Sequence, residues 1–472
     1  MNRLFVSAAH KSSGKTTLCV GLCAALRARG EVMQPFKKGP DYIDPLWLGL
    51  AAGRPCYNLD SYLSGPEEIR AEFAHRMRGA TFGIIEGNKG LYDGLDLEGS
   101  NSNAALAVLL DAPVVLVIDA RGMTRGIAPL ILGYQAFDRN VRIAGVILNR
   151  LGGSRHEAKL RAVIGHYTGV PVLGAVQHDE RLTIVERHLG LVPSNEAEAE
   201  AARARVQEIA TLVAGQVNLD SLLEVARAAP PLATTAAPTG LAPAGPAGVP
   251  VRVGVARDAA FGFYYPGDLE ALREAGAELV VFDALRDRRV PRMDGLFIGG
   301  GFPEMHMHAL ERNAELRAGL RAAIAAGLPT YAECGGLMYL ARGIEWNGRR
   351  AEMVGVVPAD IVMHARPVGR GYVHLRETGR GPWSRTSVPA QQIRAHEFHY
   401  SSVENLPPDA EFAYEVERGH GMDGRHDGIV CKNLLASYSH LRDVAGNRWA
   451  RRFVDFVRCC RVNAAQVASN FS

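Results

Sequence analysis

The segment Ser7–Thr17 contains the residue types that bind phosphate groups, and it ends in Ser12-Ser13-Gly14-Lys15-Thr16-Thr17. In phosphate-binding loops that end in Gly-Lys-Thr, backbone N–H groups and a helix N-terminus face the phosphates, the lysine neutralises them, and the first hydroxyl ligates Mg²⁺. The position of the usual first glycine is occupied by Ala9. The alternative is a plain Ser/Gly-rich turn between a strand and a helix. We expect this loop to bind a nucleoside triphosphate.

A second charged group follows the next predicted strand, where Phe36–Pro45 carries Lys37, Asp41 and Asp44. Glycine and proline favour a turn there, at the carboxyl edge of the sheet, where open α/β folds bind ligands. A lysine and paired aspartates suit a triphosphate, its metal ion and an anionic substrate, although a charged surface turn is the alternative. We expect Lys37 to bind the nucleotide and Asp44 to act in catalysis.

Three further polar residues follow apolar segments of the same half. Glu86 ends an apolar strand, where a carboxylate beside a phosphate-binding loop is expected to contact Mg²⁺, with Thr16 and Asp41 as partners. Asp93 is expected to hold a water or the substrate. Asn149 is expected to contact the adenine edge, with helix capping as the alternative.

The second half contains a cysteine with the surroundings of a nucleophile. Cys334-Gly335-Gly336 follows an apolar strand, and a sharp strand-to-helix turn with a helix N-terminus favours the thiolate. The glycine cluster after the strand Gly295–Ile298 offers backbone N–H groups for an oxyanion, and we expect Gly300, Gly301 and Gly335 to contribute them. A buried structural cysteine is the alternative.

A thiolate nucleophile needs a base, and three histidines are candidates: His396, His399 and His440. Residue types alone do not choose among them, because the fold could bring any of the three near Cys334.

These residues must be positioned by two α/β halves, in which apolar strands alternate with helical patterns and predict mostly parallel sheets covered on both faces. Predicted helices include Leu18–Arg29, Ile127–Phe137, Arg155–Tyr167, Glu196–Val213 and Leu219–Arg227. Predicted strands are Leu4–Ala8, Val32–Phe36, Phe82–Glu86, Val114–Ile118, Ile143–Leu148, Val170–Ala175, Val251–Ala256, Glu278–Phe282, Gly295–Ile298 and Pro329–Ala332.

The boundary between the halves is a change in composition. Residues 228–250 are rich in proline and alanine and cannot form a core, so they are predicted to be a linker. We therefore expect a nucleotide-binding domain over 1–227, a second α/β domain over 251–462, and a tail over 463–472.

The composition is that of an ordinary globular protein, with a net charge of +3 from 53 basic and 50 acidic residues. This balance gives no argument for a nucleic-acid or membrane partner. The seven cysteines are scattered without zinc spacing, which favours reduced thiols in a cytoplasm. No signal peptide is expected, because the apolar run 4–9 is short.

In combination, the motifs resemble the cobyrinic acid a,c-diamide synthase family along the whole chain apart from the linker and tail. The first half looks like the dethiobiotin synthetase branch of P-loop proteins, and the second is similar to class I glutamine amidotransferases. The motifs that carry the resemblance are Lys38–Pro45, Asn58-Leu59-Asp60, Glu86-Gly87, Gly90–Gly94, Arg187–Leu191, His396–Ser401 and Ala436-Ser437-Tyr438.

This resemblance implies an ATP- and Mg²⁺-dependent ligase that uses L-glutamine to amidate the a- and c-acetate groups of a corrin-type tetrapyrrole. A substrate carboxylate would form an acyl phosphate, and Cys334 would release ammonia from glutamine. His440 matches the family position that makes the cysteine nucleophilic. Asp41, Asp44, Glu86 and Asp93 match acidic positions of the synthetase centre.

The sequence departs from these family patterns in several places. Class I amidotransferases usually carry a glutamate two residues after the catalytic histidine, where this chain has Arg442, so the third member of the triad is absent or supplied elsewhere. Ala332 replaces a usual glycine, and Asn88-Lys89 with the polar segment Gly99–Asn103 replaces less polar residues near the expected substrate pocket.

Three alternatives remain open. The polar segment resembles a branch that is thought to amidate sirohaem-type macrocycles. A P-loop switch ATPase would carry a lysine where this chain has His10, and it would have no reason to carry the Cys334 turn. A non-catalytic carrier of a metallopterin or tetrapyrrole would not need Lys15 and Glu86 together with Cys334.

Overall fold

The computed structural model describes residues 1–182, 196–232, 249–383 and 392–470, which form two compact units. The first unit contains the described residues up to 232, and the second contains those from 249 onward. Most of the predicted linker, and the motif Arg187–Leu191, lie outside the described residues. None of the described helices is long and apolar enough to cross a membrane.

A seven-stranded parallel sheet forms the centre of the first unit. Its strands are β1 (Arg3–Ala8), β2 (Met33–Lys38), β3 (Tyr57–Leu59), β4 (Phe82–Glu86), β5 (Val114–Asp119), β6 (Ile143–Leu151) and β7 (Val172–Gln177). They lie in the order β3-β2-β4-β1-β5-β6-β7, and every pairing is parallel. The ends of β1, β2 and β4 therefore meet at one edge of the sheet.

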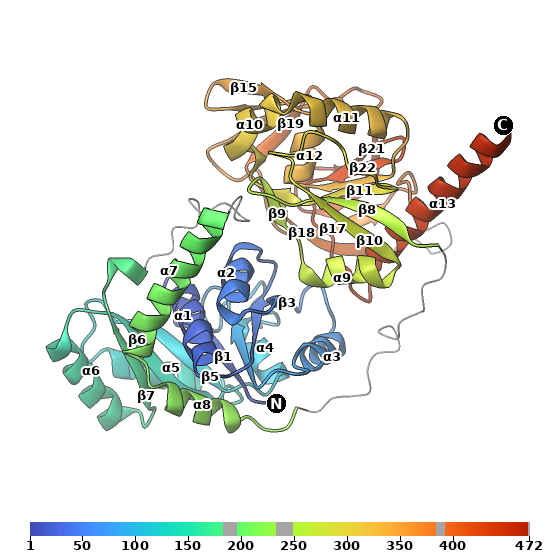
Figure 1. Ribbon diagram of the computed structural model, residues 1–472. Helices are drawn as coiled ribbons and strands as arrows, with labels where there is room; N and C mark the ends of the chain where they lie inside the picture. Colours follow the sequence, from blue (N-terminus) through green and yellow to red (C-terminus); the bar gives the residue numbers. More distant parts are fainter. Residues whose placement is uncertain (183–195, 233–248, 384–391, 471–472) are drawn as a thin grey trace. The chain divides into compact units, whose positions relative to one another are not determined.

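Helices cover both faces of this sheet, as its continuous apolar strands predict (Figure 1). Leu4 and Val6 of β1 face a core shared with α1, α2, α7 and α8, whereas Phe5 faces a core shared with α3, α4, α5 and α6. The helices are α1 (Lys15–Ala28), α2 (Ile43–Ala52), α3 (Pro66–Arg76), α4 (Asn103–Leu109), α5 (Ile127–Phe137), α6 (Ser154–Tyr167), α7 (Glu196–Ala214) and α8 (Leu219–Arg227), with the short turn η1 (Glu180–Leu182).

A nine-stranded mixed sheet forms the centre of the second unit. The strands of this unit are β8 (Val251–Ala256), β9 (Phe261–Phe263), β10 (Ala277–Phe282), β11 (Gly295–Ile298), β12 (Gly300–Gly301), β13 (Thr330–Glu333), β14 (Gly343–Trp346), β15 (Arg349–Glu352), β16 (Asp360–Met363), β17 (Gly369–Glu377), β18 (Gln392–His399), β19 (Ser401–Glu404), β20 (Glu411–Arg418), β21 (His426–Cys431) and β22 (Leu434–Ser437).

The nine strands lie in the order β10-β8-β11-β13-β22-β21-β20-β17-β18. The pairings from β10 to β22 are parallel, and those from β22 to β18 are antiparallel. Two smaller sheets, β12-β9 and β15-β14-β16-β19, flank them.

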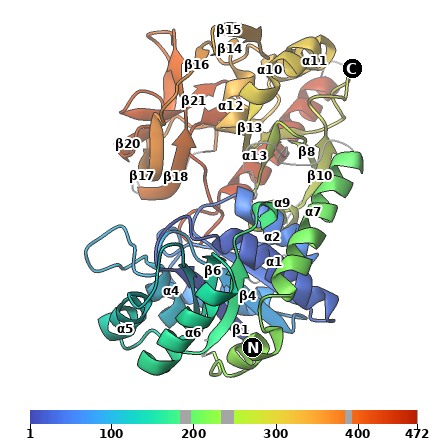
Figure 2. The same ribbon diagram turned by 90° about the vertical axis from the view of Figure 1, so that its left-hand side faces the viewer.

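Helices and a small sheet complete the cores of the second unit (Figure 2). Strands β14, β15 and β16 pack with α10, α11 and α12 in one core, and α9 packs beside α13 in the other. The helices are α9 (Pro266–Glu274), α10 (Met307–Arg312), α11 (Ala314–Ala325), α12 (Gly335–Leu340) and α13 (Trp449–Asn470), with the short turn η2 (Pro303–His306).

The α/β class with two domains is confirmed, and each predicted strand and helix lies within three residues of its predicted ends. Strand β3 and the antiparallel strands from β17 to β21 are not among the predicted elements. In addition, α13 continues through most of the segment predicted to be a tail.

Candidate functional site

The loop after β1 has the backbone conformation that a phosphate-binding loop requires. Ser12 and Gly14 have positive φ angles of 62° and 86°. A Cβ atom on Gly14 would lie 2.3 Å from Nδ2 of Asn149, so only glycine fits this position. Lys15 begins α1, which places the N-terminus of that helix directly after the loop.

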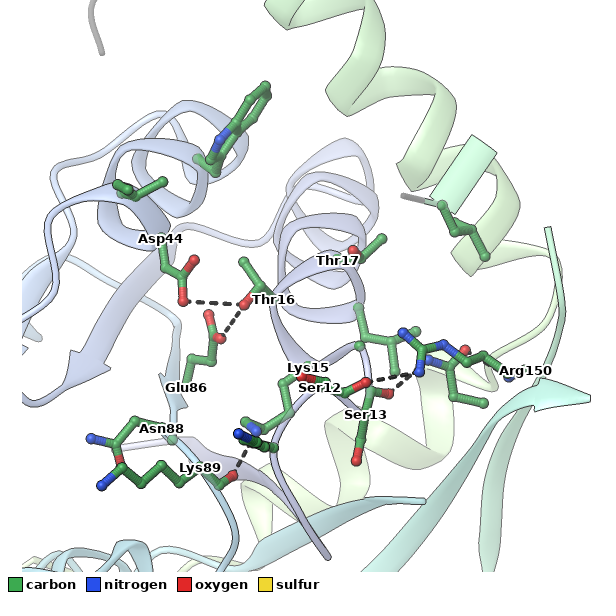
Figure 3. A pocket seen from close by; sticks show the side chains of 18 of the residues that line it. Ser12, Ser13, Lys15, Thr16, Thr17, Asp44, Glu86, Asn88, Lys89 and Arg150 are labelled. Atoms are coloured by element: carbon green, nitrogen blue, oxygen red, sulfur yellow. Dashed lines mark hydrogen bonds between the residues drawn. The ribbon is translucent and has the colours of Figure 1, made fainter. Parts of the chain in front are cut away.

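A cavity of about 670 Å³ lies at this edge of the sheet. Figure 3 shows the side chains of Lys15, Thr16, Asp44 and Glu86 around it. All the predicted nucleotide and metal residues line the cavity, as does the predicted catalytic Asp44: Ser12, Ser13, Gly14, Lys15, Thr16, Thr17, Lys37, Asp41, Asp44, Glu86 and Asn149.

An acidic cluster surrounds the Thr16 hydroxyl, which lies 2.7 Å from Oε1 of Glu86 and 3.1 Å from Oδ2 of Asp44 (Figure 3). The buried ammonium of Lys37 donates to Asp44, and also to Glu86 at 2.9 Å. Its Nζ lies 3.8 Å from Oδ2 of Asp41. Strand register explains the pairing, because Lys37 of β2 lies directly opposite Glu86 of β4.

Burial and charge shift the pKa values in this cluster in opposite directions. Burial alone would lower the pKa of Lys37, but Asp44 and Glu86 raise it well above its usual value. Burial and the neighbouring Asp44 raise the pKa of Asp41 to about 7. Burial also raises the pKa of Glu86, and Lys37 opposes that shift. One lysine therefore balances several carboxylates.

The oxygen groups of this cluster fit a magnesium ion bound with a nucleotide. Oε2 of Glu86 is buried and has no hydrogen-bond partner, so it is available as a ligand beside the Thr16 hydroxyl. Within the described part of the chain, no three His, Cys, Asp or Glu side chains are arranged to hold a metal by themselves. Mg²⁺ in nucleotide sites does not need such a cluster, because phosphates and waters complete its coordination.

Asn149 and Arg150 hold the phosphate-binding loop from the end of β6. Asn149 donates its side-chain amide to the carbonyl of Ser13 at 2.8 Å, and Arg150 donates to the carbonyl of Ser12 at 2.8 Å. Arg150 is itself held by Asp119 at 2.7 Å. The predicted contact of Asn149 with adenine stays a prediction, and the structure adds a role in holding the loop that the sequence analysis missed.

Asp93 does not line the cavity; it is exposed and accepts the Gly90 N–H at 2.8 Å, within its own loop. Asn58, from the motif Asn58-Leu59-Asp60, has a structural role. Its side-chain amide donates hydrogen bonds to the carbonyls of Gly39 and Asp41 at 2.8 and 2.7 Å. It thereby fixes the turn that carries the aspartates.

Cys334 occupies the predicted strand-to-helix turn of the second unit. It lies between β13 and α12, is 5% exposed, and has a φ angle of 47°, which is strained for a residue other than glycine. A Cβ atom on Gly335 would lie 2.8 Å from the backbone nitrogen of Gly301, and one on Gly336 would lie 2.3 Å from the Ile298 carbonyl. The glycine loop and the turn are therefore in close backbone contact, as an oxyanion site requires.

All three candidate histidines are buried near the turn, but their surroundings differ. His440 hydrogen-bonds Cys334, and its Nδ1 lies 3.3 Å from Oε2 of Glu333. His396 stacks on His440 with ring centroids 4.9 Å apart, and His399 stacks on Tyr438 at 3.7 Å. Gly300 packs against the ring of His440, where a Cβ atom would lie 2.7 Å from Cε1.

Electrostatics further distinguish His440 from His396. Burial alone would lower the pKa of His440, but its hydrogen bonds with Cys334 and Glu333 raise it to about 10. Burial and the nearby His440 and Arg442 lower the pKa of His396 well below its usual value. His440 is the histidine arranged to hold a proton beside the thiol.

Comparison with known proteins agrees with the two units. Residues 5–192 match the family model of the CobQ/CobB/MinD/ParA nucleotide binding domain, and residues 252–446 match that of the CobB/CobQ-like glutamine amidotransferase domain. Among solved structures, a glutamine amidotransferase aligns with 43% of this chain and 98% of its own length, at 18% identity and a TM-score of 0.32.

Curated relatives that bear the name cobyrinate a,c-diamide synthase match along nearly the whole chain. The protein from Magnetococcus marinus is 48% identical, covering 97% of each chain. The protein from Methanosarcina acetivorans is 40% identical over 96% of this chain and 95% of its own, and the one from Archaeoglobus fulgidus is 40% identical over 96% of each. At these identities over nearly the whole chain, this protein belongs to the cobyrinate a,c-diamide synthase family.

Proposed function

We propose that this protein amidates the a- and c-acetate carboxylates of a corrin-type tetrapyrrole, cobyrinate or hydrogenobyrinate, using ATP and glutamine. The observation that carries the proposal is that one chain combines a phosphate-binding cavity containing an acidic cluster with a buried cysteine turn beside His440. The names of its relatives, which match along nearly the whole chain, support the same reaction.

The first unit makes the substrate carboxylate reactive. Lys15 and the loop N–H groups hold the triphosphate, and Thr16, Asp41 and Glu86 are placed to hold Mg²⁺, which neutralises phosphate charge. An oxygen of the substrate carboxylate attacks the γ-phosphorus, ADP leaves, and an acyl phosphate forms. Asp44 and Lys37 lie beside this centre and position the reacting groups.

The second unit supplies the nitrogen. Cys334 gives its proton to His440 and attacks the glutamine amide carbon, and ammonia leaves with that proton as a thioester forms. Water then releases glutamate and restores the thiol. Ammonia attacks the acyl phosphate carbon, phosphate leaves, and the amide is complete.

The polar segment that resembles the sirohaem-type branch has a structural role here. Asn103 donates to Ser7 at 3.1 Å and to the Gly90 carbonyl at 2.9 Å, and Asn101 accepts the Leu95 N–H at 2.8 Å. These amides hold their own loop and join it to β1, so they do not argue for a different macrocycle. A switch ATPase is disfavoured by the cysteine site.

Replacing the nucleophile tests the division between the two sites. Cys334→Ala is expected to abolish amidation with glutamine and to keep amidation with high ammonia within about twofold, because ammonia bypasses the thiol. Product mass counts the amides formed on cobyrinate, hydrogenobyrinate and sirohydrochlorin. Cys459→Ala, which removes an exposed cysteine, is the matched control and stays active. Loss of both activities in Cys334→Ala would contradict two separate sites, and a switch ATPase would amidate none of the macrocycles.

Replacing Glu86 tests the synthetase centre. Glu86→Gln is expected to lower amidation at least about 100-fold with either nitrogen source, because the charge beside Thr16 and Lys37 is lost. Hydrolysis of glutamine alone is measured in parallel and stays detectable. Glu224→Gln, on the exposed face of α8, is the control with the same chemical change. Normal amidation by Glu86→Gln would remove this residue from the metal site.

A further inference from the structure

The carboxylate of Glu333 is buried one residue before the nucleophile, and both of its oxygens are engaged. Oε1 accepts the Tyr331 hydroxyl at 2.6 Å and the Leu441 N–H at 2.9 Å. Oε2 lies 3.3 Å from Nδ1 of His440, and the Glu333 residue is only 3% exposed. Two donors thus orient the carboxylate so that its second oxygen faces the imidazole.

The local fold explains how the adjacent residues Glu333 and Cys334 both contact His440. Side chains alternate along a strand, so Tyr331 and Glu333 of β13 point to the same face of the sheet. Glu333 pairs in register with Ser437 of β22, three residues before His440. The turn then reverses at Cys334, whose positive φ angle directs its backbone into α12.

Arg442, which occupies the position of the usual class I glutamate, contacts Asp268 and Tyr265. Its guanidinium lies 3.4 Å from Asp268 and 4.2 Å from the centre of the Tyr265 ring. A carboxylate partner for His440 therefore comes from the strand before the nucleophile rather than from the segment after the histidine.

We propose that Glu333 is the third member of the glutaminase site, a positioning residue that accepts the Nδ1 proton of His440 and leaves Nε2 to take the Cys334 proton. This inference rests on the proposed hydrolysis of glutamine. In the balanced step, the thiol proton moves to Nε2 and then to the departing ammonia. The Nδ1 proton stays shared with Glu333 throughout.

The electrostatics of the pair agree with this role. The titratable groups that face His440 include Glu333 from β13, Cys334 from the turn and His396 from β18. Hydrogen bonds with Cys334 and Glu333 raise the pKa of His440, whereas the lowered pKa of His396 keeps that neighbour neutral. A carboxylate at Nδ1 therefore stabilises the imidazolium that forms when the thiol ionises.

The test uses the full chain with Glu333→Gln and Glu333→Asp. The glutamine amide in Glu333→Gln can donate to Nδ1, which puts the imidazole proton on Nε2 and removes the base. Glutamine hydrolysis by Glu333→Gln is expected to fall at least about 100-fold in kcat, while ammonia-supported amidation stays within about twofold. Glu333→Asp keeps a carboxylate and recovers part of the rate.

A second measurement does not depend on turnover. The rate of iodoacetamide alkylation at Cys334 is followed against pH by peptide mass, and its midpoint is expected to rise by about one pH unit or more in Glu333→Gln. Glu397→Gln is the matched control, because it changes another buried carboxylate beside a histidine, 3.6 Å from His399. Its midpoint is expected to stay at the wild-type value.

An unchanged alkylation midpoint in Glu333→Gln would overturn the inference, even if turnover fell, because a purely structural role would not move the midpoint. Unchanged glutamine hydrolysis would overturn it as well. If wild-type protein instead failed to hydrolyse glutamine while the alkylation midpoint still shifted in Glu333→Gln, the proposed function would fail and the Glu333–His440 pair would stand.

Discussion

Single buried charges are balanced differently at the two sites. In the first unit, one lysine, Lys37, neutralises a cluster that includes Asp44 and Glu86. In the second, His440 lies between a carboxylate and a thiol. Both arrangements keep a positive charge where the proposed reaction needs one. Removing the charged partner of a buried group such as Lys37 or His440 would lower the free energy of unfolding by several kcal/mol.

Asp258 is a buried carboxylate outside both proposed centres, and it predicts a pH dependence of stability. Burial raises its pKa to about 6 although it accepts backbone N–H groups of Ala260, Phe261 and Ala284. Because the pKa is raised above the unfolded value, the stabilising contribution is fully present below about pH 4 and is lost as pH rises through 6. The free energy of unfolding therefore falls by roughly 2–3 kcal/mol between about pH 4 and pH 6 because of Asp258.

The variant Asp258→Asn is expected to lose this contribution, so its melting temperature falls less than that of wild type between pH 4.5 and pH 7. Tryptophan fluorescence follows the second unit, because Trp346, Trp383 and Trp449 lie there and only Trp47 lies in the first. Asp409→Asn, an exposed position in the same unit, is expected to keep the wild-type dependence. Identical pH dependence in Asp258→Asn and wild type would contradict the prediction.

At the scale of elements, sites form where parallel strands end. β1, β2 and β4 are adjacent, so the phosphate-binding loop, Lys37 and Glu86 meet although the sequence separates them. In the second unit, β13 and β22 are neighbours, and they bring Cys334 close to His440. Glycine permits the close approach of α12 to the strands beside it.

Gly336 tests that close approach. A Cβ atom there would lie 2.3 Å from the Ile298 carbonyl, so Gly336→Ala is expected to destabilise the second unit by roughly 1–3 kcal/mol. It should also lower glutamine hydrolysis more than ammonia-supported amidation, because the cysteine turn must shift. Gly446→Ala, at a glycine with open space around it, is the control for thermal unfolding and kinetics. Wild-type stability in Gly336→Ala would show that the backbone contact is dispensable.

At the scale of the whole molecule, the chain consists of two units with separate cores. The composition of residues 228–250 predicts a linker between them, most of which lies outside the described residues. An independent core in each unit suits the proposed function, which assigns one reaction to each half.

This organisation predicts the outcome of limited proteolysis. Elastase cleaves after small residues, and brief digestion of the native protein is expected to cut first within 233–248, where alanines are frequent. Two fragments should accumulate and be identified by mass. Each should keep its own thermal transition, because neither core depends on the other for its buried residues. Early cuts inside a sheet, or simultaneous loss of both transitions, would contradict the linker.

Local sequence patterns determined much of this protein. Apolar strands, the Ser12–Thr17 loop and the Cys334-Gly335-Gly336 turn depend on residues that are close in sequence, so their conformation and chemistry could be predicted directly. The antiparallel strands β17 and β20 were not singled out, because they are partly exposed and lack a continuous apolar run.

Only the tertiary structure decided which distant groups meet. It placed His440, the histidine that the family resemblance indicates, beside Cys334, placed Glu333 against its Nδ1, and placed Arg442 against Asp268. It also assigned Arg150 to hold the phosphate-binding loop. The physical reason is that these contacts join residues from different strands and loops, and strand order and register, rather than local propensity, set which side chains face one another.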